Sequence, residues 1–214
     1  MKIKVFTFSP FQENTYVVWD EVTAEGIIID PSCLSEEEER ELKLFVESNN
    51  LKVKYLLNTH GHLDHIFGNA FVMNTFAPIH YVPEMDLPLF NRGVEQAESF
   101  GLKMKESPKS ENFFSESEVL TIGETEIKFL FTPGHTQGEY SIYFPSENTC
   151  FTGDVLFKES IGRTDLWGGD IDTLLNSINN KLFPLPDETI IYPGHGESST
   201  IKNEKVNNPF LKSH

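Results

Sequence analysis

Apolar and polar residues along the first sixty positions follow short runs that are typical of β-strands. Residues 2–8 alternate, residues 15–19 are rich in β-branched and aromatic side chains, and residues 26–30 contain three consecutive isoleucines. A further strand is predicted over residues 52–57, which lead directly into a cluster of histidines. We therefore predict four strands in this part of the chain.

Other segments have the spacing of helices. Ser35 and Glu38 form a capping box, and the acidic first turn that follows suits the helix dipole, so a helix is predicted over residues 35–48. The polar stretch at residues 103–112 contains helix breakers and is predicted to be a loop. Further helices are predicted over residues 64–76, 83–101 and 170–183, and further strands over residues 78–82, 119–122, 126–131, 140–144, 149–152 and 189–192.

The order of these elements predicts the fold class. Each half of the chain has strands followed by helices, and no repeat of 20–50 residues is visible. Two mixed sheets packed face to face, with helices on both outer faces, would bury every amphipathic element. We expect an α/β protein built as a four-layer αββα sandwich, with residues 1–214 as a single domain and residues 201–214 as a C-terminal tail.

Charge and composition narrow the classes of partner. The 214 residues include 17 basic and 33 acidic side chains, a net charge of −16, which disfavours binding to nucleic acid phosphates. The hydrophobic fraction of 38% is typical of a globular protein, and no apolar run approaches the length of a membrane span. We expect no nucleic-acid or membrane partner, whereas a small anionic substrate stays possible. The oligomeric state is left open.

The cysteines and the first residues indicate the compartment. Cys33 and Cys150 are 117 positions apart and form no disulfide framework, so reduced and buried thiols are expected. The first residues lack the apolar region and cleavage site of a signal peptide. These features predict a soluble protein of the cytoplasm.

The segment Thr59-His60-Gly61-His62-Leu63-Asp64-His65 is the strongest chemical signal in the chain. With this composition, a chance H-x-H-x-D-H match is expected in roughly three of ten thousand such chains. In an extended or turn backbone, residues i and i+2 project the same way, so His60 and His62 can share one metal ion. Asp64 and His65, at the start of the next predicted helix, can reach a second ion beside it.

Three later residues complete a plausible ligand set. His135, Asp154 and His195 each follow a predicted strand, and each has a glycine directly before it. Donors at strand ends are typical of a site at one edge of a sheet. Imidazole and carboxylate donors without a thiolate suit zinc, iron or manganese.

These motifs, together and in this order, resemble the metallo-β-lactamase superfamily. The pieces H-x-H-x-D-H, T-P-G-H-T, T-G-D and P-G-H match its pattern, and an aspartate at position 154 resembles the glyoxalase II (hydroxyacylglutathione hydrolase) branch. True β-lactamases of this superfamily commonly carry a cysteine there, so β-lactam hydrolysis is not expected. The G-D-x-L-F…G-R and N-P-F-L-K segments, at residues 153–163 and 208–212, also resemble glyoxalase II in its short bacterial form.

The resemblance implies which residue holds which ion. It assigns His60, His62 and His135 to one metal, Asp64, His65 and His195 to the other, and Asp154 to both as a bridge. Two zinc ions per chain are expected, with iron or manganese as alternatives. Asp30 is predicted either to cap a strand or to support a metal ligand.

The resemblance also implies a reaction. Two cations lower the pKa of the water between them, and the resulting hydroxide attacks a carbonyl carbon. Asp64 and Asp154 are the expected catalytic residues, with Asp64 orienting that hydroxide. The favoured substrate is a small-molecule thioester such as S-D-lactoylglutathione. Arg163 and Lys212 match cationic residues that contact glutathione in the family, although for each a surface ion pair is a serious alternative. After Arg163, the pair Thr164-Asp165 departs from the longer enzymes of the branch.

Other functions stay open on the same ligands. The first alternative is a persulfide dioxygenase with a single iron, and the second is a lactonase or another ester hydrolase of the superfamily. A ribonuclease is less favoured because no basic recognition segment is evident. A metal-binding protein without catalytic activity would require a missing ligand, and all seven expected ligands are present.

Overall fold

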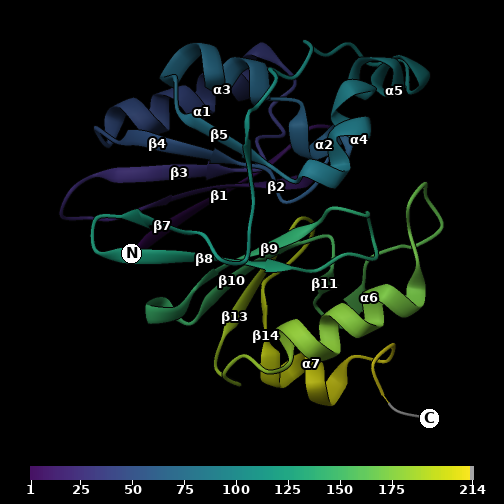
Figure 1. Ribbon diagram of the computed structural model, residues 1–214. Helices are drawn as coiled ribbons and strands as arrows, with labels where there is room; N and C mark the ends of the chain where they lie inside the picture. Colours follow the sequence, from purple (N-terminus) through teal and green to yellow (C-terminus); the bar gives the residue numbers. More distant parts are fainter. Residues whose placement is uncertain (213–214) are drawn as a thin grey trace. The chain divides into compact units, whose positions relative to one another are not determined.

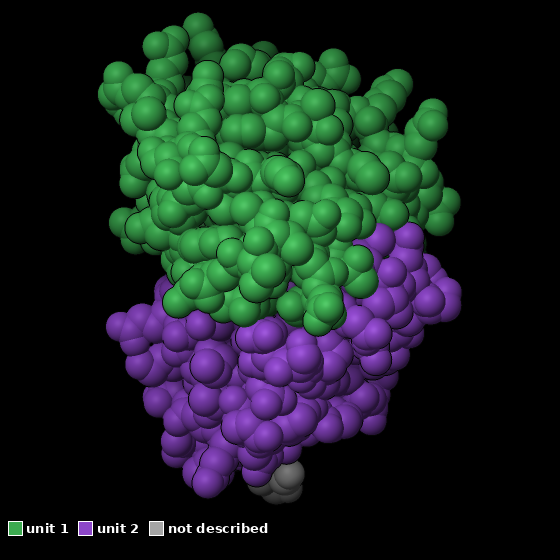
Figure 2. Space-filling model, turned by 90° about the vertical axis from the view of Figure 1, so that its left-hand side faces the viewer, with its two compact units in different colours: residues 1–114, 121–125 green, residues 115–120, 126–214 purple. Residues whose placement is uncertain are grey.

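The chain forms two mixed β-sheets, each accompanied by its own helices (Figure 1). The structure is a computed structural model that describes residues 1–212. The described chain divides into two compact units, coloured separately in Figure 2. Unit 1 comprises residues 1–114 and 121–125, and unit 2 comprises residues 115–120 and 126–214. The prediction of an α/β fold with two mixed sheets is confirmed.

The first sheet lies in unit 1. Its first three strands run antiparallel to one another, and its last three continue in parallel. The strands follow the order β1 (Lys2–Phe8), β2 (Glu13–Trp19), β3 (Glu25–Ile29), β4 (Lys52–Leu57), β5 (Ile79–Val82) and β6 (Asn112–Phe113).

The second sheet belongs to unit 2, except for residues 121–125, which form the turn between its last two strands and the adjoining strand ends and are grouped with unit 1. A two-stranded hairpin, β11 (Leu156–Phe157) with β12 (Ser160–Ile161), stands apart from it. The strands of the second sheet follow the order β14 (Ser199–Thr200), β13 (Ile190–Pro193), β10 (Thr149–Gly153), β9 (Tyr140–Phe144), β8 (Thr125–Phe131) and β7 (Val119–Ile122).

Helices cover a face of each sheet. In unit 1, α1 (Glu36–Ser48) and α3 (Asn69–Phe76) pack on the first sheet, and Leu42 and Val72 lie in one apolar cluster with Phe6 and Ile28 (Figure 1). Unit 1 also contains α2 (Leu63–Ile66), η1 (Glu84–Asp86), α4 (Leu87–Asn91) and α5 (Gly93–Ser99).

Unit 2 repeats this arrangement with different helices. Leu174, Ile178 and Ile201 pack against Cys150 and Ile191 of the second sheet, so that the helices close over buried strands. The first three of these residues belong in turn to α6 (Ile171–Ser177), the π-helical turn η3 (Ile178–Leu182) and α7 (Ile201–Asn207). A further short helix, η2 (Pro145–Glu147), joins β9 to β10.

Several predicted helices are interrupted. The segment 64–76 contains two helices because the amide of Gly68 donates to the carbonyl of Pro31 at 2.7 Å. A Cβ on Gly68 would lie 2.5 Å from the sulfur of Cys33, so the backbone approaches its neighbour closely there. The segment 83–101 likewise divides into η1, α4 and α5, and 170–183 divides into α6 and η3.

The shortest elements were not predicted from the sequence. The strands β6, β11, β12 and β14 have two residues each, too few for a period to be read. Residues 201–207, predicted as part of a tail, form α7, whose N-cap Thr200 accepts a hydrogen bond from the amide of Asn203. No helix in residues 1–212 combines the length and the apolar character needed to cross a bilayer.

The sheet register decides where the chemical groups lie. Ile29 of β3 pairs with Leu57 of the parallel strand β4, so Asp30 and Asn58 emerge together at one edge. In unit 2, β10 and β13 are also parallel, and the strands end together at Gly153 and Pro193. Each unit therefore places polar residues at the carboxyl ends of adjacent parallel strands.

Candidate metal centre

The histidine cluster of unit 1 occupies the turn between β4 and α2. His62 is the N-cap of α2, with φ −68° and ψ 149°, so the chain is extended at His62 and becomes helical directly after it. Gly61 between them has no room for a side chain, because a Cβ there would lie 2.8 Å from Leu89 and 2.9 Å from Phe90. The turn is thus held against α4.

Three imidazoles converge in this turn. Nε2 of His60 lies 3.1 Å from Nδ1 of His62, and the ring centroids of His60 and His65 are 4.0 Å apart. Two nitrogens on one tetrahedral zinc, each about 2.0–2.1 Å from the ion, would be roughly 3.3 Å apart. His60 and His62 therefore have the spacing of two ligands of one ion. Asp64, partly buried, is the neighbour of His65 on α2.

Hydrogen bonds set the tautomers of two of these histidines. The hydroxyl of Thr59 donates to Oδ2 of Asp30 at 2.6 Å, so its oxygen accepts from Nδ1 of His60 at 3.1 Å. Nδ1 of His65 donates to the same Asp30 oxygen at 3.0 Å. Both rings therefore carry the proton on Nδ1 and present the lone pair of Nε2, as metal-binding histidines require.

Asp30 thus contacts one of the predicted metal ligands directly and another through Thr59. Its Oδ1 accepts the amide of Thr59 at 2.7 Å, so one carboxylate holds the backbone before His60 and the ring of His65. Asp30 adopts φ +47°, an uncommon conformation for a residue other than glycine. The surrounding bonds hold the side chain in this position.

The sequence analysis missed Glu13. This glutamate at the start of β2 is fully buried, and its Oε1 lies 3.5 Å from Nδ1 of His65. Burial raises the pKa of Glu13 well above its ordinary value, although the nearby His65 opposes the shift. No local pattern marks this residue, because a glutamate at a strand start is usually exposed.

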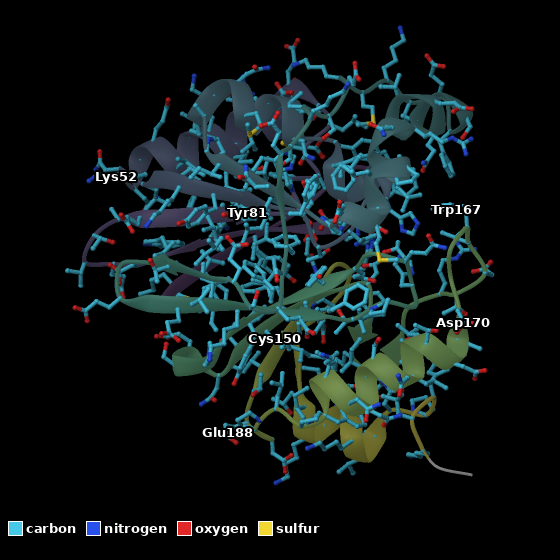
Figure 3. The ribbon with its side chains drawn as sticks, in the orientation of Figure 1. Lys52, Tyr81, Cys150, Trp167, Asp170 and Glu188 are labelled. Atoms are coloured by element: carbon cyan, nitrogen blue, oxygen red, sulfur yellow. The ribbon has the colours of Figure 1, made fainter. Side chains whose placement is uncertain are left out.

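A buried amide network supports the same turn from the other side. Asn58 donates to the carbonyl of His65 at 2.9 Å and to Oδ1 of Asn69 at 3.2 Å, and Asn69 donates back to Asn58 at 2.9 Å. Nε2 of His80 donates to Oδ1 of Asn58 at 2.7 Å. Burial lowers the pKa of His80 to about 4, so this ring is neutral near pH 7. His80 lies in β5, directly before Tyr81, which is labelled in Figure 3.

Unit 2 brings together the other three predicted ligands. His135, Asp154 and His195 follow β8, β10 and β13, and Oδ2 of Asp154 lies 3.5 Å from Nε2 of His135 and 3.7 Å from Nε2 of His195. One carboxylate oxygen thus lies within 4 Å of two imidazole nitrogens. Donors this close together are near enough to bind the same ion.

Backbone contacts hold this second group in place. Nδ1 of His135 donates to the carbonyl of Arg163 at 2.8 Å, which leaves Nε2 as the acceptor and possible ligand. The amide of Asp154 donates to Oε1 of the buried Glu139 at 2.7 Å. A Cβ on Gly162 would lie 1.9 Å from the carbonyl oxygen of Asp154, so the chain packs tightly there. Glu139 was not predicted from the sequence.

The predicted substrate-binding residues have a different environment. The guanidinium of Arg163 is exposed and forms a two-point ion pair with Asp165. Lys212 is exposed at the end of the described chain. Cys33 and Cys150 are buried and unpaired, as predicted, and burial raises the pKa of both thiols.

A family comparison decides the identity of the chain. The profile described as Metallo-beta-lactamase superfamily matches residues 8–195, a span that includes all seven predicted ligands. The chain belongs to the metallo-beta-lactamase superfamily. The predicted fold class is that of this superfamily.

Relatives in the metallo-beta-lactamase superfamily cover the whole chain. Hydroxyacylglutathione hydrolase GloC of Haemophilus influenzae is 40% identical over 100% of this chain and 99% of its own. The crystal structure of the BLEG-1 B3 metallo-beta-lactamase has a TM-score of 0.90 and 34% identity, covering 99% of this chain and 100% of that one. The crystal structure of TTHA1623 in a di-iron-bound form has a TM-score of 0.86 and 34% identity, covering 97% and 100%.

Membership of this superfamily implies divalent metal ions, and the donors present fit them. Unit 1 offers three neighbouring imidazoles, two of which have nitrogens at ligand spacing, and unit 2 offers two imidazoles within 4 Å of one carboxylate oxygen. Neutral imidazole and carboxylate are donors for zinc, iron or manganese. The donor set of each unit is therefore suited to a metal.

Proposed function

We propose that this protein is a dinuclear metal-dependent hydrolase that cleaves thioesters such as S-D-lactoylglutathione. The proposal treats residues 1–214 as one hydrolase domain whose ligands from both units act together. The observation that carries it is Oδ2 of Asp154 within 4 Å of two imidazole nitrogens, a spacing that supports a carboxylate sharing metal ions with both histidines. The 40% identity to a hydroxyacylglutathione hydrolase supports the choice of reaction.

We assign the seven proposed ligands to two metal ions. His60, His62 and His135 are proposed to hold one ion, Asp64, His65 and His195 the other, and Asp154 both. Once bound, a pair of divalent cations supplies a water of lowered pKa and polarises the carbonyl to be cleaved. We expect zinc, with iron as the first alternative because one solved relative is described as di-iron-bound.

The chain's own residues prepare this chemistry. Asp30 and the carbonyl of Arg163 hold His65 and His135 by their Nδ1 atoms, so that neither ring has to change its proton or its orientation when a metal binds. Asp64 is proposed to orient the attacking water. A thioester suits such a site because its leaving thiolate needs little protonation, and therefore no separate acid is required.

The test is metal analysis of the purified protein together with release of thiol from S-D-lactoylglutathione. Asp154→Ala should lower kcat/KM by at least roughly a hundredfold and reduce the bound metal, since even partners outside the ligand set cost this much. Asp187→Ala, which removes an exposed carboxylate paired with Lys205, is the matched control and should keep both. Full activity in the Asp154 variant would refute the assignment.

Measurements on the same purified protein distinguish the alternative functions. A persulfide dioxygenase would contain one iron per chain and consume oxygen with glutathione persulfide. A lactonase would open lactones faster than thioesters. A β-lactam belongs in the substrate panel because one solved relative is named a B3 metallo-beta-lactamase.

A further inference from the structure

A cavity of about 270 Å³ lies in unit 1, beside α4. It is bounded by the end of β5, by α4 and by the loop at residues 107–110, all of them residues other than the seven proposed ligands. Sites for drug-sized ligands usually have roughly 300–1,000 Å³. At about 30 Å³ for each molecule of liquid water, this cavity has room for roughly nine waters or a small organic ligand of equal volume. A glutathione thioester is too large for it.

One wall of the cavity is apolar. Val82 at the end of β5 and Phe90 of α4 are buried, and the half-buried Leu87 packs against the same apolar cluster. Pro108 adds a further apolar surface from the loop. Because contact with such a wall removes apolar surface from water, it favours a ligand with a compact apolar body.

Hydrogen bonds hold the loop that forms the opposite wall. The hydroxyl of Ser110 donates to the carbonyl of His80 at 2.5 Å and accepts from the amide of Asn112 at 3.1 Å. Nδ2 of the buried Asn69 donates to Oγ of Ser107 at 2.8 Å. The two residues between these serines are therefore held in place, and the cavity is a fixed feature of the fold.

Two hydrogen-bond donors line the cavity from this loop. Ser107 is only 9% exposed; its oxygen accepts from Asn69, and its own hydroxyl proton is donated to no other residue within 1–212. Lys109 is exposed, and its ammonium group forms no ion pair within the same part of the chain. An ammonium and a hydroxyl that are both able to donate complement an anionic oxygen, such as that of a carboxylate.

We propose that this cavity is a binding site for a small monocarboxylate with a compact apolar body. The carboxylate accepts hydrogen bonds from Ser107 and Lys109, and the body packs against the apolar wall. A dicarboxylate is disfavoured, because its second charge would lose water against that wall without gaining a partner. The net charge of −16 disfavours anions over most of the surface, so recognition depends on the local ammonium group.

The experiment uses benzoate as the probe, because its size and its single carboxylate match the cavity. Titration of the isotope-labelled, zinc-loaded protein should shift the amide NMR signals of residues 87–91 and 107–110, with a Kd on the order of 1 mM. Benzamide has the same shape without the charge and should bind roughly fivefold more weakly. Acetate lacks the apolar body and should bind at least roughly tenfold more weakly.

Two variants and a matched control locate the carboxylate. Lys109→Gln should weaken the binding of benzoate roughly fivefold and leave that of benzamide unchanged. Lys103→Gln is the control, since Lys103 is an exposed lysine of the same loop that lies outside the lining of the cavity, and the Kd should stay that of the wild type. Ser107→Ala should also weaken the binding of benzoate. Because this change removes an acceptor from Asn69 as well, Lys109→Gln is the decisive variant.

The outcomes separate this site from the proposed metal centre. Shifts confined to the amides around His60, His65 and His135 would show that benzoate binds a metal, and they would refute the cavity as its site. Equal affinities for benzoate and benzamide, or a wild-type Kd in Lys109→Gln, would refute it equally. The proposed hydrolysis does not depend on this cavity, so either result leaves that proposal as it stands.

Discussion

At the scale of single residues, the proton on each histidine is determined by its partner. Thr59 has one hydroxyl proton and gives it to Asp30, so its oxygen can only accept from His60. The carbonyl of Arg163 has no proton and determines the tautomer of His135 in the same way. These partners do not touch a metal, but they decide which nitrogen is available to one.

The Thr59 hydroxyl provides a direct test. Thr59→Val keeps the shape of the buried side chain and removes the acceptor for Nδ1 of His60, so the ring can take the tautomer that does not bind. We expect the affinity for zinc or cobalt, measured by competition with a chromophoric chelator, to fall roughly 10- to 100-fold.

The control for this variant is Thr149→Val. Thr149 is also buried, but its hydroxyl donates to the carbonyl of Glu147 at the end of β10 away from Asp154. This control should lose stability without losing metal affinity. Equal affinities in the Thr59 variant and wild type would show that the hydrogen bond does not orient His60.

At the scale of elements, the ligands depend on how loops pack against helices. His135 lies in a loop fixed to α6, because the amide of Asp170 donates to the carbonyl of Gly134 at 2.8 Å and Ser177 donates to that of Pro133 at 2.7 Å. Gly134 has φ +133°, and a Cβ there would lie 2.3 Å from the backbone of Leu174. Only glycine fits between the loop and the helix.

Gly134→Ala should therefore separate the loop from α6. Strain and overpacking together should lower the free energy of unfolding by about 3 kcal/mol or more, measured by urea denaturation of the metal-free protein. The matched control is Gly101→Ala, which has φ +70° but no atom within 4 Å of the added Cβ. It should lose only about 1–2 kcal/mol, the cost of the left-handed backbone. Similar losses in the two variants would rule out the packing explanation.

At the scale of the whole molecule, each unit contributes residues that we propose as metal ligands. Bound ions should then stabilise the folded chain in proportion to their affinity. At a free metal concentration of 100 times Kd, the gain is about 2.7 kcal/mol, which corresponds to a rise in Tm of roughly 5–10 °C for a chain of this size.

Metal removal tests this expectation. Protein treated with a chelator and dialysed should unfold at a lower temperature than the untreated protein, and added zinc should restore the Tm in scanning calorimetry. His60→Ala in unit 1 and His195→Ala in unit 2 should each reduce that restoration. An unchanged Tm after verified metal removal would contradict the expected stabilisation by bound metal.

The sequence alone determined the features that depend on near neighbours. The spacing in His60-Gly61-His62 is local, and the structure places Nε2 and Nδ1 of these rings 3.1 Å apart, close enough to bind one ion. The runs of apolar residues predicted the main strands of both sheets, because a strand's period is readable over five or more residues. The motifs of the superfamily indicated the same fold, and the profile of the superfamily matches residues 8–195.

Only the tertiary structure decided the features that depend on distant contacts. Glu13 is 52 positions before His65, and Glu139 is 15 before Asp154, so no local pattern relates them. Asp165 is close to Arg163 in sequence, yet only coordinates show that their side chains meet. Folding brings such groups together through the register of parallel strands and the packing of loops on helices, neither of which is present in the order of residues alone.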